Sequence, residues 1–159
     1  MRLVFYKGKG LISRLIQWQT RGQYSHVGLQ LEDGSVIEAW HIGGVRHNAG
    51  LGTAHELGTE VDIYLVEHVT KAEKMRVLDF LKSKLGRDYD FRSVFRFLSR
   101  RGESDEDRDK WFCSELIAAA FASAGVKLLM TNPSRISPEI LSWSPRLVKL
   151  ETVFTTKPD

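Results

Sequence analysis

The spacing of apolar residues along the chain predicts short strands alternating with amphipathic helices. Apolar residues at every second position indicate strands, and apolar residues three or four positions apart indicate helices. Strands are predicted over residues 2–6, 24–31, 35–40, 60–66 and 146–150. Helices are predicted over residues 11–18, 71–85, 90–101 and 113–124, with a helical turn beginning at Ser137. In the helix over 71–85, the residues expected to face one side are Met75, Leu78, Leu81 and Leu85.

Two alternating segments on either side of an Asp-Gly turn signal predict a β-hairpin, whose register decides which side chains share a face. A two-residue turn would place Leu29 opposite Glu38 and bring a carboxylate onto the apolar face, which is costly. A three-residue loop with Gly34 in the left-handed region instead places Leu29 opposite Ile37. We predict this second register. It leaves Glu38 on the other face, diagonal to His26 and within reach of its imidazole. The pattern fits equally well an ordinary solvated sheet face formed by Tyr24, His26 and Glu38.

The segment from Gly43 to Gly58 is rich in glycine and is predicted to be a surface loop. It carries His47 and His55, which are expected to be solvated. The cysteine and histidine positions of the chain show no zinc-ligand spacing. We therefore predict neither a metal nor a cofactor.

Composition sets the frame for these elements. A chain of 159 residues with 42% hydrophobic and 27% charged positions is predicted to form a single domain over residues 1–159. The net charge of +3 allows attraction to anionic surfaces but is no nucleic-acid signature. A single cysteine excludes an intramolecular disulfide. Neither a signal peptide nor a membrane span is recognisable, and we expect a cytoplasmic protein.

The single cysteine lies in the stretch F-C-S-E-L-I-A-A-A-F, in the first turn of a predicted helix. Unpaired backbone N–H groups and the helix dipole favour an anion at such a position, and they can also hold an oxyanion. Cys113 is therefore a candidate nucleophile. It also shares one helix face with Ile117, Ala120 and Ala124, and a small buried cysteine would suit that apolar stripe equally well.

Three stretches of the sequence resemble the NlpC-type papain-like cysteine peptidases. The segment H-V-G-L-Q-L-E-D-G-S-V-I-E-A is similar to the histidine hairpin of that family, and W-F-C-S-E-L-I to its cysteine helix. The segment L-G-R-D-Y-D-F resembles the tyrosine-containing block that precedes the cysteine. Here the histidine precedes the cysteine, which is the order in the circularly permuted branch with the YiiX-like proteins. The similarity covers most of the chain between Leu11 and Gly125.

The resemblance implies an α+β, papain-like fold in which an antiparallel sheet packs against helices and the cysteine begins one helix. It implies that Cys113 is the nucleophile, that His26 is its base and that Glu38 orients the imidazole. The backbone N–H of Cys113 and the Tyr89 hydroxyl would bind the oxyanion, although Tyr89 could equally be a packed aromatic residue. Tyr24 and Ser114 are further candidates for substrate binding.

The implied reaction is hydrolysis of an amide or peptide bond through an acyl-thioester. Candidate substrates are a peptide, a peptidoglycan fragment or a lipid-like molecule, with no nucleic acid among the expected partners. Glu115 stands where ordinary NlpC enzymes have glycine, which weakens the case for a cell-wall substrate. A thiol-dependent lipid esterase or acyltransferase is an alternative, although F-C-S-E-L differs from the N-C-E-H-F block of those enzymes. The other alternative is a catalytically silent module that binds a peptide or lipid.

A separate feature is the row of arginines on the predicted helix over 90–101. Arg92, Arg96 and Arg100 recur at every fourth position opposite an apolar side, a pattern that fits either a solvated face or weak contact with an anionic surface. The acidic segment from Glu103 to Asp109 follows. Its solvated charges are expected to affect Cys113 less than a contacting imidazolium would.

Overall fold

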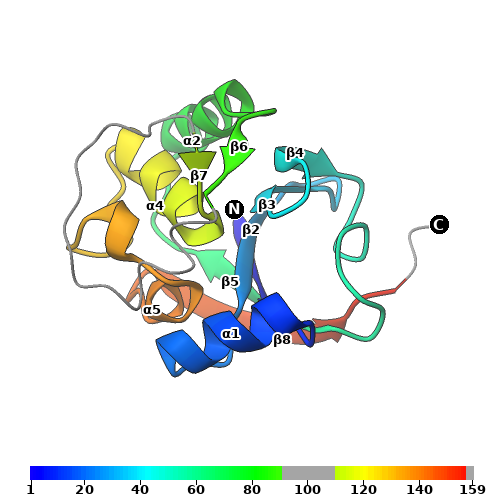
Figure 1. Ribbon diagram of the computed structural model, residues 1–159. Helices are drawn as coiled ribbons and strands as arrows, with labels where there is room; N and C mark the ends of the chain where they lie inside the picture. Colours follow the sequence, from blue (N-terminus) through cyan, green and yellow to red (C-terminus); the bar gives the residue numbers. More distant parts are fainter. Residues whose placement is uncertain (91–109, 157–159) are drawn as a thin grey trace.

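The computed structural model describes residues 1–90 and 110–156, which contain a six-stranded antiparallel sheet with helices packed on it (Figure 1). The strands lie in the order β4-β3-β2-β1-β5-β8, and each neighbouring pair is antiparallel. Their bounds are β1 (Arg2–Lys7), β2 (His26–Gln30), β3 (Val36–Trp40), β4 (Gly44–Asn48), β5 (Glu60–Val66) and β8 (Leu147–Phe154). Two short strands, β6 (Asp88–Tyr89) and β7 (Lys110–Trp111), pair in parallel in a separate sheet.

The helices follow the predicted order. They are α1 (Leu11–Thr20), α2 (Lys71–Ser83), α4 (Cys113–Ser123) and α5 (Pro138–Ser142), with a 3-10 turn η1 at Pro133–Arg135. Within the described part of the chain, none of them is long and apolar enough to cross a membrane. The α+β class, the antiparallel sheet and a cysteine at the first position of a helix are thus confirmed.

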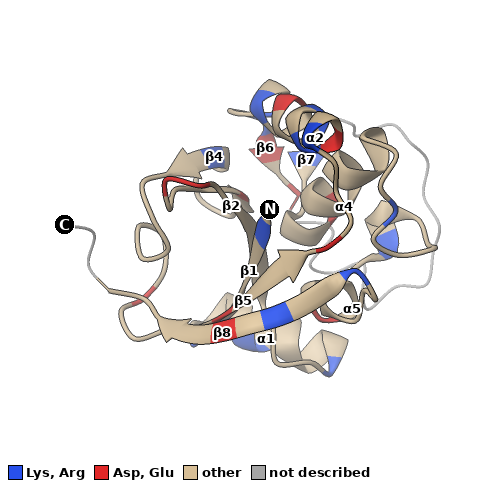
Figure 2. Cartoon of the chain, turned by 180° about the vertical axis from the view of Figure 1, so that it is seen from behind, with Lys and Arg blue, Asp and Glu red and all other residues tan. Residues whose placement is uncertain are grey.

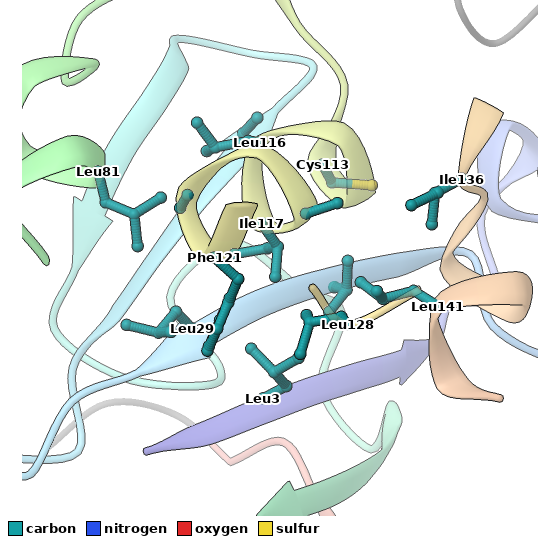
Figure 3. Close-up of a cluster of buried hydrophobic side chains, with 14 of the residues drawn as sticks. Leu3, Leu29, Leu81, Cys113, Leu116, Ile117, Phe121, Leu128, Ile136 and Leu141 are labelled. Atoms are coloured by element: carbon teal, nitrogen blue, oxygen red, sulfur yellow. The ribbon is translucent and has the colours of Figure 1, made fainter. Parts of the chain in front are cut away.

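Helix α4 supplies the centre of the main hydrophobic core. Its residues Leu116, Ile117 and Phe121 are fully buried between the sheet and the other helices (Figure 3). Burying a large apolar side chain of this kind contributes about 1.5–3 kcal/mol relative to leaving it exposed. Cys113 belongs to the same cluster, and its sulfur lies at the end of the helix on the side of Ile136. Packing of the core therefore fixes the position of Cys113 relative to the sheet.

The register of the β2–β3 hairpin is the predicted one. Leu29 lies opposite Ile37, and Gly34 has a φ of +86°, in the left-handed region. The loop is closed by the N–H of Leu31, which donates to the carbonyl of Ser35 at 2.8 Å. Keeping the apolar residues on one face decides this register, because a shift by one residue would bury Glu38 among them.

The buried side of α2 differs from the prediction. The helix begins at Lys71 as expected, because Thr70 and Glu73 form a capping box. However, Val77 and Leu81 are its buried residues, whereas Met75 is 57% exposed and Leu85 is also exposed. Helix α2 packs against α4, and that contact rather than the spacing of apolar residues selects the buried stripe.

The segment over 43–58 is not entirely a loop. It contains β4, which pairs with β3 along its whole length and adds an edge to the sheet. Val45 is the one apolar side chain among its five residues, so the sequence shows no alternation that would predict a strand here. Similarly, β8 is longer than the predicted strand because backbone pairing with β5 holds side chains that are mostly exposed. The predicted helix over 90–101, with Arg92, Arg96 and Arg100, and the acidic segment over 103–109 lie largely or entirely outside the described residues.

We expect Gly28→Ala to destabilise the fold, because a Cβ at this position would lie 2.7 Å from Val36 Cγ1 and 3.3 Å from Glu38 Cβ. The branched valine cannot yield without leaving its rotamer, and overpacking of this kind costs about 1–3 kcal/mol. The free energy of unfolding, measured in urea, tests this. Gly50→Ala is the matched control, since a Cβ there meets nothing within 4 Å. Equal stability of the two variants would contradict the expectation.

Candidate active site

His26 is the first residue of β2, and aromatic side chains hold its ring in place. The ring centroid lies 5.5 Å from that of Tyr6 on β1 and 5.0 Å from that of Trp40 on β3, the latter edge to face. The histidine is almost fully buried. Its position at the start of the strand leaves it at the border between the sheet and the beginning of α4.

Glu38, on the neighbouring strand β3, binds the imidazole through a hydrogen bond that reasoning from the hairpin predicted. The Nε2 atom of His26 donates to Oε2 of Glu38 at 2.7 Å, and Asn48 Nδ2 donates to Oε1 at 2.5 Å. Burial alone raises the pKa of Glu38, but the charge and hydrogen bond of His26, followed by those of His55, hold that pKa well below its usual range. Glu38 is therefore an ionised carboxylate inside the protein.

Cys113 is the third member of this group. Its interaction with the imidazole is among the causes that raise the pKa of His26, and since Nε2 is taken by Glu38, the ring nitrogen left for the sulfur is Nδ1. Burial lowers the pKa of His26, but the negative charges of Cys113 and Glu38 and hydrogen bonds to both raise it to about 10. His26 is therefore held as an imidazolium beside the ionised carboxylate of Glu38.

The start of α4 adds to the polarity around the sulfur. Phe112 is the N-cap residue and gives no side-chain cap to the first turn of the helix. The backbone N–H groups of that turn and the positive end of the helix dipole favour negative charge at Cys113. The cysteine is also fully buried, so it is at once a core residue and the sulfur partner of His26.

Tyr89 lies near the same sulfur. It is the last residue of β6, which pairs with β7, the strand that precedes α4 in the chain. The ring centroid of Tyr89 is 5.9 Å from that of Phe112. Burial raises the pKa of Tyr89, and the negative charges of Cys113 and Asp90 raise it further. The hydroxyl therefore keeps its proton and can act as a hydrogen-bond donor.

The other two predicted substrate-binding residues have structural partners instead. Ser114 is fully buried, and its hydroxyl donates to the carbonyl of Ile136, which ties α4 to the segment before α5. The hydroxyl of Tyr24 donates to Asp62 Oδ2 at 2.6 Å and contacts the hydroxyl of Tyr64 at 2.9 Å. The structure therefore does not bring Tyr24 into the group formed by Cys113, His26 and Glu38.

His55 is a member of the site that the sequence did not reveal. It was expected to be solvated, yet its side chain is 4% exposed and its Nε2 lies 3.3 Å from Glu38 Oε2. Its ring is stacked on Tyr6 with centroids 3.6 Å apart. Burial lowers the pKa of His55, and the charge of His26 also opposes its protonation. A neutral second histidine therefore shares the carboxylate with a charged one.

The ligand atoms of His26, Glu38 and His55 all lie within 4.8 Å of one another. Two imidazole nitrogens and one carboxylate oxygen are a donor set that Zn²⁺ uses in catalytic sites. The residues present thus fit a divalent metal. The sequence spacing could not indicate this group, because the three residues come from β2, β3 and the segment between β4 and β5.

A pocket of about 180 Å³ adjoins His55. Its walls include Trp40 and His41 on one side and Leu11 and Ile12 of α1 on another. Two of its lining residues, Trp40 and His55, also contact the His26 ring.

Comparison with known proteins gives a likeness of fold. No protein-family model matches the sequence, and no curated protein matches it. Among solved structures, the metalloprotein YiiX from Escherichia coli O157:H7, assigned to DUF1105, superposes with a TM-score of 0.70. The two sequences are 19% identical, and the match covers 97% of each chain. The chain therefore has a YiiX-like fold.

The pKa values of the buried pair predict how stability depends on pH. The pKa of His26 is raised from 6.5 to about 10, so its contribution is fully present below pH 6.5 and is lost as the pH rises through 10. The pKa of Glu38 is lowered from 4.5, so its contribution is present above pH 4.5 and is lost at lower pH. Glu38→Gln removes the pair. Its loss of unfolding free energy should be largest between pH 4.5 and 6.5 and smaller on either side.

Urea unfolding of both proteins at a series of pH values measures this difference. Glu60→Gln is the control, because Glu60 pairs with Lys7 near the surface, where such a pair contributes about 0–1 kcal/mol. A destabilisation by Glu38→Gln that is independent of pH would show that the carboxylate acts only through packing.

Proposed function

We propose that the protein is a cysteine-dependent hydrolase that cleaves an amide or peptide bond through Cys113, His26 and Glu38. The observation that carries the proposal is the placement of His26, whose Nε2 is hydrogen-bonded to Glu38 at 2.7 Å and whose pKa is raised by Cys113 as well as by Glu38. A nucleophile, its base and an orienting carboxylate in this order are the arrangement that activates a thiol. The presence of all three argues against a catalytically silent binding module.

The proposed chemistry begins from the ion pair in which Nδ1 of His26 already holds the proton of the Cys113 thiol. The sulfur of Cys113 then forms a bond to the carbonyl carbon, and the π electrons move to the oxygen. The backbone N–H of Cys113 and the Tyr89 hydroxyl would stabilise that oxyanion. When the carbonyl forms again, the C–N bond breaks and His26 gives its proton to the leaving amine. Water, deprotonated by His26, finally cleaves the thioester and releases the thiolate.

Access to the sulfur is the main requirement that this proposal places on the substrate. Cys113 is fully buried, so a substrate must displace neighbouring atoms before its carbonyl reaches the sulfur. A peptide or peptidoglycan fragment is the favoured substrate class. A lipid-like ester would undergo the same steps with an alcohol as leaving group, and a panel of peptide and ester substrates would separate the two.

The thiol chemistry can be tested directly with iodoacetamide. We expect His26→Ala to slow alkylation of Cys113 by about tenfold or more at neutral pH, because the imidazolium no longer stabilises the thiolate. His47→Ala is the matched control, since His47 is exposed and binds Ser35 rather than Glu38. In the substrate panel, Cys113→Ala should abolish turnover, whereas Glu38→Gln should retain a measurable fraction. Equal alkylation rates in the two histidine variants would refute the proposed pair.

A divalent metal centre is the second candidate function, favoured by the convergence of His26, Glu38 and His55. The similar structure of YiiX is described as that of a metalloprotein, which also supports it. A metal held here would act as a Lewis acid or lower the pKa of a bound water. Both Nε2 atoms would have to lose their protons first, so binding should strengthen as the pH rises. Because Nε2 of His26 serves Glu38 in the hydrolase, the two functions compete for one atom.

Zinc titration of the metal-free protein, followed by calorimetry, separates the two functions. We expect His55→Gln to weaken any zinc binding by about 10–100-fold while the alkylation rate of Cys113 changes little. Cys113→Ser is the control and should leave zinc binding unchanged. Failure of the wild-type protein to bind zinc at any pH between 6 and 9 (about the range in which imidazole ligands lose their protons) would exclude this second function.

A further inference from the structure

Helix α1 turns apolar side chains toward solvent. Leu11 is 88% exposed and Trp18 is 70% exposed, whereas Ile16 is the buried residue of the helix. Leu11 and Trp18 are seven positions apart, so they lie on the same face two turns from each other. In Figure 1 this helix forms the lower edge of the molecule. We call this outward face, formed by Leu11 and Trp18, the α1 crest.

Basic residues flank the α1 crest. Arg14 lies between Leu11 and Trp18 on the adjoining face, and Arg21 follows the helix as its C-cap. Neither arginine has an ion-pair partner among the described residues, and residues 8–23 include no Asp or Glu. Lys9 precedes the helix and donates to the carbonyl of Gly58. Figure 2 shows basic but no acidic positions along α1. The apolar crest therefore lies within a stretch of chain whose charged side chains are all positive, with Glu139 beside its end at Gln23 and Glu56 near Gly10.

We infer that α1 docks on an anionic lipid bilayer, with the helix axis in the plane of the membrane surface. The crest would enter the boundary between headgroups and acyl chains, where tryptophan is favoured because its ring is amphipathic. Arg14 and Arg21 would remain at the level of the phosphates. Because α1 has only ten residues, binding should be weak, reversible and sensitive to salt.

A second copy of the chain is a poorer occupant of the crest. A two-fold contact through α1 would place Arg14 and Arg21 of one copy close to the same arginines of the other, since such an interface uses the same patch twice. No acidic residue of the helix could neutralise them. An anionic bilayer provides negative phosphates for the arginines and an apolar layer for the side chains of the crest.

Docking in this orientation would also bring the pocket beside His55 close to the membrane. Leu11 and Ile12 line that pocket together with His55 and Trp40. If the proposed hydrolase function holds, an acyl chain or a lipid-linked peptide would enter from the bilayer side. This consequence rests on the proposed function, whereas binding of α1 to lipid does not.

Vesicle flotation of the full chain tests the inference. The wild-type protein should bind vesicles of phosphatidylcholine mixed with phosphatidylglycerol and should bind pure phosphatidylcholine vesicles more weakly. Each surface arginine contributes about 1 kcal/mol at an anionic membrane, so Arg14→Gln with Arg21→Gln should reduce partitioning by about tenfold or more. Leu11→Glu with Trp18→Glu should reduce it at least as much.

The matched control replaces two apolar residues of equal exposure elsewhere, Met130→Glu with Trp143→Glu. Met130 is 88% exposed and Trp143 is 67% exposed. Thermal unfolding should show that all variants are folded. An absence of wild-type binding, or equal loss in the control, would overturn the inference. So would a wild-type dimer, seen by light scattering, that the α1 variant converts to a monomer. Alkylation of Cys113 in the absence of vesicles should be unaffected by the α1 changes, which keeps this test separate from that of the proposed function.

Discussion

The buried carboxylate of Glu38 is the group on which the arrangement of the site depends. An ionised carboxylate without partners would be very costly in this position, so its hydrogen bonds must all form when the chain folds. His26 comes from β2, Asn48 from β4 and His55 from the segment before β5. One side chain therefore holds three separate parts of the chain together, and the orientation of the catalytic candidate His26 is a by-product of stability. Asp62 on β5 has a similar role in the other half of the sheet. Its carboxylate contacts the side chains of Lys7, Lys149, Tyr24 and Thr152.

Cys113 has two roles that the fold reconciles. As the first residue of α4 it closes the hydrophobic core, and as the sulfur partner of His26 it belongs to a charged group. The two interpretations of Cys113 from the sequence, a buried core residue and a candidate nucleophile, are thus compatible. The buried residues of α4 fix the position of the helix, and its N-cap residue Phe112 gives no side-chain cap. In the proposed hydrolase, this packing would keep the sulfur beside His26.

The two proposed chemistries would share His26 because an imidazole has two nitrogens that can have different partners. With a proton on Nε2, His26 binds Glu38 and can serve the thiol from Nδ1. Without that proton, Nε2 could act with the Nε2 of His55 as a metal donor, and the proton on Nδ1 would then prevent His26 from accepting another from Cys113. The YiiX-like fold is consistent with either outcome, since at 19% identity it establishes the architecture and not the chemistry.

The sequence by itself determined the local features of this protein. Alternation of apolar residues and the left-handed Gly34 identified the hairpin and its register, and with it the approach of Glu38 to His26. The pattern also placed Cys113 at a helix start, because caps, turns and periodicity act over a few residues. Only the tertiary structure decided that Val77 rather than Met75 faces the core, that β4 pairs along β3, and that His55 is buried against Glu38. Each of these depends on contacts with segments far away in the sequence, which the spacing of residues within one segment does not indicate.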